Sequence, residues 1–308
     1  MNARSKKKVS KNSELKTTLI ILLIFVLCAG TIIFLHKQKQ IVKNPKVFKP
    51  PIVIVPPTVL QSALPVTVKL NKTPIRKAVP SINVKSFKIA FVIDDWGYST
   101  RNCTILSDIK YPLAVSILPN LRHSLDVVKC AQNANKEVML HLPMQPYFNH
   151  DPYPDNYVLT TTMSPNKVES ILESILKKMP EIAGVNNHMG SKAMEDKRLL
   201  KLLFRHLKQH HLFFVDSMTS PNHSYGSEVA KEYGLSFGQR DVFLDNTNSR
   251  ESILKQFDEL MSKATKKGYA IAIGHDRELT MRMIKEEAPV LEKHGFVIVS
   301  VKELLRKQ

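Results

Sequence analysis

Residues Phe87-Lys-Ile-Ala-Phe-Val-Ile-Asp-Asp95 form an apolar run of strand length that ends in two adjacent carboxylates. A short, continuous apolar run is typical of a strand that is buried on both faces, as in a parallel sheet. Further runs of this kind occur at residues 113–118, 137–142, 212–215, 269–273 and 296–299, with weaker ones at 182–186 and 235–237. We therefore expect a buried sheet from residue 87 onward.

Amphipathic segments lie between several of these runs. Residues 165–178 follow Ser164, a good N-cap residue, and begin with proline, which is favoured at the first helical position. Residues 195–211 and 252–267 have apolar side chains at helical spacing. Alternating strands and helices predict parallel pairing through right-handed crossovers. The expected fold over residues 87–308 is a deformed (β/α) barrel of about seven parallel strands, with an open doubly wound sheet as the alternative.

The first 86 residues differ in composition from the rest. They hold 16 lysine and arginine residues against one acid, Glu14, although the whole chain has a formal net charge of +18. The remaining 29 basic and 26 acidic residues leave residues 87–308 nearly neutral. A nucleic-acid-binding domain needs its basic side chains on the folded surface. We therefore expect no nucleic acid partner, and the sequence leaves protein partners open.

Residues 17–35 are an uncharged apolar segment of 19 residues. This length suits a helix of roughly 20 residues that crosses a bilayer, and it exceeds the roughly 7 to 15 apolar residues of a cleaved signal peptide. We expect a basic cytoplasmic tail at 1–16, a transmembrane helix at 17–35 and an extended, proline-rich basic linker at 36–86. The predicted location is the inner membrane, in a single pass, with the C-terminal domain periplasmic or extracellular.

Cys103 and Cys130 lie in segments with helical patterns. No Cys-x-x-Cys spacing occurs, so the sequence indicates neither a zinc knuckle nor a redox motif. The two residues could form a disulfide in an oxidising compartment, but the expectation is two free, mostly buried thiols. His206 and His210 are one helical turn apart, and without a glutamate between them they are expected to form a solvated helix face.

Acids, amides and imidazoles follow several predicted strands. They are Asp94 with Asp95, His141, Asn187 with His188, Asp216 with Ser217, and His275. The carboxyl ends of parallel strands lie on one face, so these side chains are expected around one mouth. Adjacent strand residues alternate in direction, so Asp94 and Asp95 are expected to point different ways. Helix capping is the alternative role for either acid.

The chemistry of this set suits metal-assisted hydrolysis. One carboxylate with two imidazoles is an ordinary ligand set for zinc or another divalent transition metal. Such an ion polarises a carbonyl and lowers the pKa of water, as hydrolysis of an amide or ester requires. The second carboxylate would then act as general base and His275 would protonate the leaving group. Asn187, Asp216 and Ser217 would orient ligands or substrate.

Five segments that include these strand ends follow one another along the chain. They are Ile89-Ala-Phe-Val-Ile-Asp-Asp-Trp-Gly-Tyr98, His141-Leu-Pro-Met144, Asn187-His-Met-Gly-Ser191, Phe213-Phe-Val-Asp-Ser217 and Ala272-Ile-Gly-His275. Together they resemble the divergent polysaccharide deacetylase family, related to the NodB-like carbohydrate esterases. The resemblance implies a deformed barrel in which Asp94 is the catalytic base, Asp95 a metal ligand and His275 the catalytic acid.

The chain departs from the classical pattern of these deacetylases in two places. The classical enzymes have two metal-binding histidines four residues apart, whereas Gln145 stands four residues after His141. His188 is the candidate for the second imidazole. The classical Arg-Pro-Tyr motif that supports the base is also absent.

The expected function is that of a membrane-anchored, metal-dependent hydrolase that deacetylates a cell-envelope polysaccharide. Its metal would be a divalent ion, with zinc as the first candidate, bound by Asp95, His141 and His188. Two alternatives remain open: an inactive glycan-binding or envelope scaffolding protein on the same fold, and an envelope assembly factor that works through its anchor and linker. The sequence alone leaves open whether the chain is an enzyme.

Overall fold

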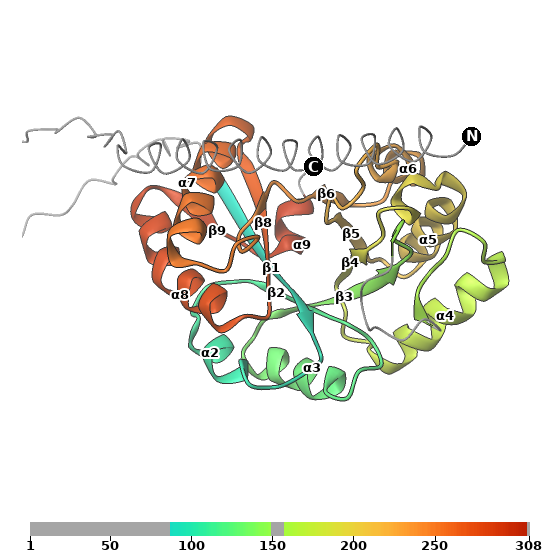
Figure 1. The fold of residues 1–308 in the computed structure, drawn as a ribbon, viewed down its shortest axis with the longest axis horizontal. Coiled ribbons are helices and arrows are strands. Elements are labelled where there is room, and N and C mark those ends of the chain that lie inside the picture. Colours follow the sequence, from blue (N-terminus) through green and yellow to red (C-terminus); the bar gives the residue numbers. More distant parts are fainter. Residues whose placement is uncertain (1–86, 149–156, 307–308) are drawn as a thin grey trace, which may run out of the picture. The chain divides into compact units, whose positions relative to one another are not determined.

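The computed structural model of the protein describes residues 87–148 and 157–306 (Figure 1). The predicted tail, transmembrane helix and linker fall in residues 1–86, outside this part of the chain, and so they stay predictions. In the part that is described, none of the helices has the length and apolar character needed to cross a bilayer.

One sheet of parallel strands organises residues 87–306. Its order is β6-β5-β4-β3-β2-β1-β8-β7, and β9 pairs with β1. The strands are β1 (Phe87–Trp96), β2 (Ala114–Ile117), β3 (Glu137–Met144), β4 (Gly184–Met189), β5 (Phe213–Asp216), β6 (Phe237–Gln239), β7 (Val242–Phe243), β8 (Tyr269–His275) and β9 (Phe296–Ile298).

The sheet curls back on itself. Its opposite edges are β6 and β7, yet only Arg240 and Asp241 separate these two strands in the chain. The backbone can join the two edges over so short a distance only if they lie close together. The predicted deformed barrel is therefore confirmed, and the described residues supply nine strands rather than about seven.

Helices cover the outside of the curled sheet (Figure 1). They are α2 (Cys103–Asp108), α3 (Ser124–Asn133), α4 (Pro165–Lys178), α5 (Lys197–Gln209), α6 (Gly226–Tyr233), α7 (Arg250–Lys267) and α8 (Glu278–Lys293). The predicted start of α4 is confirmed, because Ser164 caps the helix by accepting a hydrogen bond from the Lys167 N–H. The short α9 (Val301–Leu305) packs with the residues that face the inside of the barrel.

Strand alternation divides the core into an outer and an inner layer. In β1, Ile89, Phe91 and Ile93 pack in the outer core beneath the helices, whereas Ala90 and Val92 pack in the inner core. Successive strand residues point to opposite faces, so the even-numbered positions of β1 face the inside of the barrel. The next even-numbered residue is Asp94, near the carboxyl end of β1, and this pattern directs its side chain toward the mouth of the barrel.

Cys103 of α2 and Cys130 of α3 form a disulfide, with their Cα atoms 5.9 Å apart. The expectation of two free thiols was therefore wrong. The cysteines meet because α2 and α3 pack against one another, and that contact is not visible in the pattern of either helix alone.

We expect Cys103→Ser to lower the free energy of unfolding by about 3.5 kcal/mol, because the disulfide closes a loop with a sequence separation of 27 and restricts the unfolded chain. Denaturant unfolding of the oxidised chain and the variant measures the difference. Cys28, the third cysteine of the chain, lies in the predicted transmembrane segment. Cys28→Ser is the matched control and is expected to unfold like the unsubstituted chain. Equal unfolding midpoints for Cys103→Ser and this control would contradict the prediction.

Candidate active site

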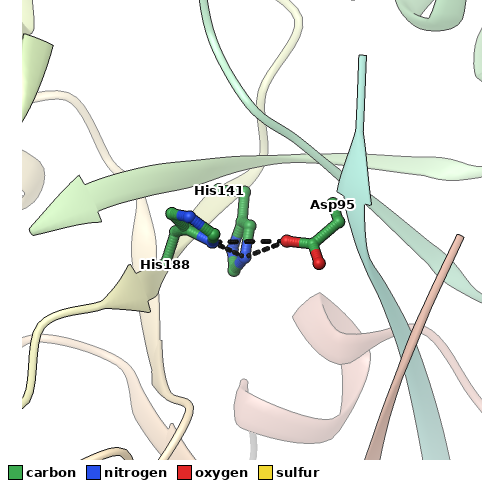
Figure 2. Close-up of side chains that lie close together, drawn as sticks. All are labelled: Asp95, His141 and His188. Atoms are coloured by element: carbon green, nitrogen blue, oxygen red, sulfur yellow. Dashed lines mark hydrogen bonds and ion pairs between the residues drawn. The ribbon is translucent and has the colours of Figure 1, made fainter. Parts of the chain in front are cut away.

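Side chains from β1, β3 and β4 converge at the carboxyl edge of the sheet (Figure 2). Asp95 Oδ1 lies 3.3 Å from Nε2 of His141 and 3.2 Å from Nδ1 of His188, and these two nitrogens are 3.1 Å apart. Ligand atoms bound at about 2.0–2.1 Å around a tetrahedral zinc ion are roughly 3.3 Å from one another. The three donor atoms thus form a triangle of the size that zinc requires, made by the three residues predicted as ligands.

A bulge in β1 brings Asp95 into this triangle. Between Ile93 and Trp96 the register of β1 with β2 shifts, and Asp95 has a left-handed backbone with φ of 64°. A bulge breaks strand alternation and redirects side chains. The expectation that the two acids point different ways was therefore wrong, since Asp94 Oδ2 also lies 3.7 Å from His141 Nε2.

A buried amide, Asn186 of β4, connects the acids to the imidazoles. Its Nδ2 donates to Asp94 Oδ1 at 2.9 Å and to Ser217 Oγ at 3.2 Å. Its Oδ1 accepts from Ser116 Oγ and from Nδ1 of His141 at 3.1 Å. Because Nδ1 of His141 carries the proton of that bond, Nε2 would offer its lone pair to a metal when the ring is neutral.

Sequence reasoning missed Asn186, although a signal for it was present. It lies two residues before His188 in the same strand, and residues two apart in a strand share a face. The predicted direction of His188 therefore also implied that Asn186 faces the inside of the barrel.

The two adjacent carboxylates differ in proton affinity. Burial raises the pKa of Asp94 and outweighs the attraction of the nearby His141 imidazole. Burial acts in the same direction on Asp95, but hydrogen bonds from His141 and His188 hold the pKa of Asp95 well below its usual range. Neighbouring acids whose environments separate their pKa values in this way commonly divide the roles of base and fixed anion.

His275, at the end of β8, forms a pair with Asp245. Its Nδ1 lies 2.8 Å from Asp245 Oδ1, and Thr280 Oγ1 donates to Asp245 Oδ2 at 2.6 Å. Burial opposes the charged imidazole, but the hydrogen bond and charge of Asp245 raise the pKa of His275. Its Nε2 lies 3.8 Å from Asp95 Oδ2, so this nitrogen is next to the triangle.

Asp245 was also missed in the sequence. It follows β7, which has only two residues, and a run that short shows no periodicity. The available signal was the apolar segment Val242-Phe-Leu244 immediately before Asp245. The apolar residues of β1 precede Asp94 in the same way.

The three residues predicted to orient ligands lie in different surroundings. Ser217 Oγ contacts the Asn186 amide and so borders the site. Asn187 Oδ1 accepts from the Ser217 backbone N–H at 2.8 Å, which ties the end of β4 to the end of β5. Asp216 Oδ1 accepts from the backbone N–H two residues later, at 2.7 Å. The bonds of Asn187 and Asp216 thus hold the loops after β4 and β5.

Gln145, which stands four residues after His141, bonds to the segment that follows β3. Its Oε1 accepts hydrogen bonds from both N and Oγ1 of Thr161, each at 2.9 Å. These bonds hold the segment that follows β3. The second imidazole of the triangle instead comes from β4, as His188.

Known proteins resemble this chain in sequence and in fold. The family model described as divergent polysaccharide deacetylase matches residues 91–305. The uncharacterized protein YibQ of Escherichia coli K12 is 33% identical over 199 residues, which cover 65% of this chain and 61% of YibQ. An uncharacterized protein of Haemophilus influenzae is 31% identical over 205 residues, which cover 67% of this chain and 72% of that protein. The crystal structure of an uncharacterized protein from Agrobacterium tumefaciens C58 matches with a TM-score of 0.66 at 21% identity, over 73% of this chain and 92% of that one.

Proposed function

Because the chain belongs to the divergent polysaccharide deacetylase family, we propose that it is a metal-dependent hydrolase that removes acetyl groups from a cell-envelope polysaccharide. The triangle of Asp95, His141 and His188 is the observation that carries this proposal. A zinc ion held there would supply a Lewis acid for the acetyl carbonyl and lower the pKa of water.

Asp94 is the general base of the proposed reaction. It is buried beside the triangle and fixed by the Asn186 amide, and its raised pKa lets it accept a proton from the attacking water. The low pKa of Asp95 suits a ligand that stays ionised. The two acids near the end of β1 thus have separate roles.

His275 is the general acid. Asp245 binds Nδ1 of the imidazole and favours its protonated form, while Nε2 lies beside the triangle. A proton on Nε2 can pass to the sugar nitrogen or oxygen as the bond to the acetyl group breaks.

Exposed aromatic side chains follow two of the strands that form the site. Tyr98, after β1, is 50% exposed, and Tyr147 and Phe148, after β3, are 45% and 80% exposed. Large exposed apolar side chains at a site commonly mark a binding surface, and flat rings with negative faces suit the C–H groups of a sugar. These residues support a polysaccharide as the substrate.

We also propose that the domain lies outside the cytoplasm, anchored in the inner membrane by residues 17–35. The uncharged length of that segment supports an anchor. The disulfide between Cys103 and Cys130 supports an oxidising compartment, since disulfides persist there and are rare in the cytosol.

Acetate release from acetylated oligosaccharides tests the proposed function. We expect chelator-treated protein to be inactive and to regain activity when zinc is added, and we expect His188→Ala to reduce the zinc-restored rate by about 10²-fold or more. The half-buried His123 provides the matched control, since His123→Ala removes an imidazole outside the triangle. Acetate release that survives both the chelator and His188→Ala would overturn the proposed metal dependence.

A further inference from the structure

We propose a second transition-metal site, between α4 and α5, formed by Glu173, His206 and His210. These residues lie on helices that cover the outside of the barrel (Figure 1), whereas the proposed active site lies at the strand ends. The site would take a zinc, nickel or copper ion, since two imidazoles and a carboxylate suit these metals.

The geometry of the three donors fits one ion. Glu173 Oε1 lies 3.1 Å from Nε2 of His210 and 3.5 Å from Nε2 of His206, and the two imidazole centroids are 4.6 Å apart. The three donor atoms all lie within 4.8 Å of one another. Donor atoms of one tetrahedral zinc ion are separated by roughly 3.3 Å, so small side-chain adjustments would bring the three to bonding distance.

His206 provides an independent observation. The residue is only 6% exposed, and its Nε2 is buried without a hydrogen-bond partner among the residues that the structure describes. Buried polar nitrogens are nearly always satisfied. Glu173 Oε1 is close to His210 but leaves Nε2 of His206 with a 3.5 Å contact that does not form a hydrogen bond. A shared metal ion would satisfy all three side chains.

The expectation of a solvated helix face was wrong for His206, which is buried, although His210 is exposed. His206 and His210 do lie one turn apart on α5, which places them on the same face. The carboxylate comes from α4, a separate helix, and so the spacing within α5 could not reveal it. An ion bound by all three residues would tie α4 to α5 and stabilise the outer helical layer.

Zinc titration of the metal-free full chain, followed by calorimetry, tests the proposal. We expect the unsubstituted chain to bind two equivalents of zinc. His210→Ala and Glu173→Gln change exposed residues, and each variant is expected to bind one equivalent. His188→Ala, which removes a ligand of the proposed active site, is also expected to bind one equivalent, and His188→Ala with His210→Ala none. The neighbouring His211→Ala is the matched control and is expected to bind two.

The same titration distinguishes this site from the active site. If His210→Ala and Glu173→Gln bind as much zinc as the unsubstituted chain and as tightly, the second site does not exist. The second site is also excluded if the unsubstituted chain binds a single equivalent of zinc and only His188→Ala abolishes that binding. One equivalent that only His210→Ala and Glu173→Gln remove would support this site while overturning the metal at the proposed active site.

Discussion

Replacing Asp94 with asparagine is expected to lower the rate of acetate release by about 10²- to 10⁴-fold, the usual contribution of a general base. The amide has nearly the shape of the carboxylate, but it cannot accept the proton of an attacking water. Asp95, His141 and His188 are unchanged, so the variant should keep its zinc. Measuring kcat/KM together with the zinc concentration that restores activity separates these two effects.

Asp95→Asn is the matched comparison for this result. It makes the same replacement of a carboxylate by an amide at the neighbouring residue. Because it removes the fixed anion of the triangle, it should raise the zinc concentration needed for activity. If the two variants behave alike, the division of roles between the acids is wrong. If the unsubstituted chain binds acetylated glycan and releases no acetate, the chain is instead a glycan-binding protein on a deacetylase fold.

Most of the site could be predicted from the residues that stand at the ends of the predicted strands. In parallel strands the carboxyl ends share one edge, so the positions of His141, His188 and His275 sufficed to place all three around one mouth. Their directions follow from alternation along each strand, because Met139 and Ile273 pack in the inner core two residues before His141 and His275. Regular backbone made these residues predictable.

Apart from Asn186, which lies on the same face of β4 as His188, the missed features depend on irregular backbone or on packing. The direction of Asp95 is set by a bulge and a positive φ, and neither has a distinctive pattern in this sequence. Asp245 follows a two-residue strand at the edge of the sheet. The Cys103–Cys130 disulfide joins two helices, and an amphipathic pattern shows which face of each helix is buried but not which helix lies beside it.

Asn186→Ala is the second substitution with a large expected effect. It leaves Asp94, Ser116, His141 and Ser217 each without one hydrogen bond in a buried site, and we expect a loss of about 3 kcal/mol in the free energy of unfolding. His141 also loses the acceptor that fixes its Nδ1 proton, so the zinc affinity should fall by about 10- to 100-fold. Denaturant unfolding and zinc titration measure these two effects.

The pH profile distinguishes positioning of the base from a general loss of structure. Burial raises the pKa of Asp94, while the Asn186 hydrogen bond lowers it, so removing that bond raises the pKa further. A base acts only when unprotonated, and the acid limb of kcat/KM should therefore move to higher pH in zinc-saturated Asn186→Ala. Asn187→Ala is the matched control, because this adjacent amide bonds to the backbone of Ser217 and not to Asp94. Should both variants lose stability while neither moves the acid limb, Asn186 supports the fold and does not position the base.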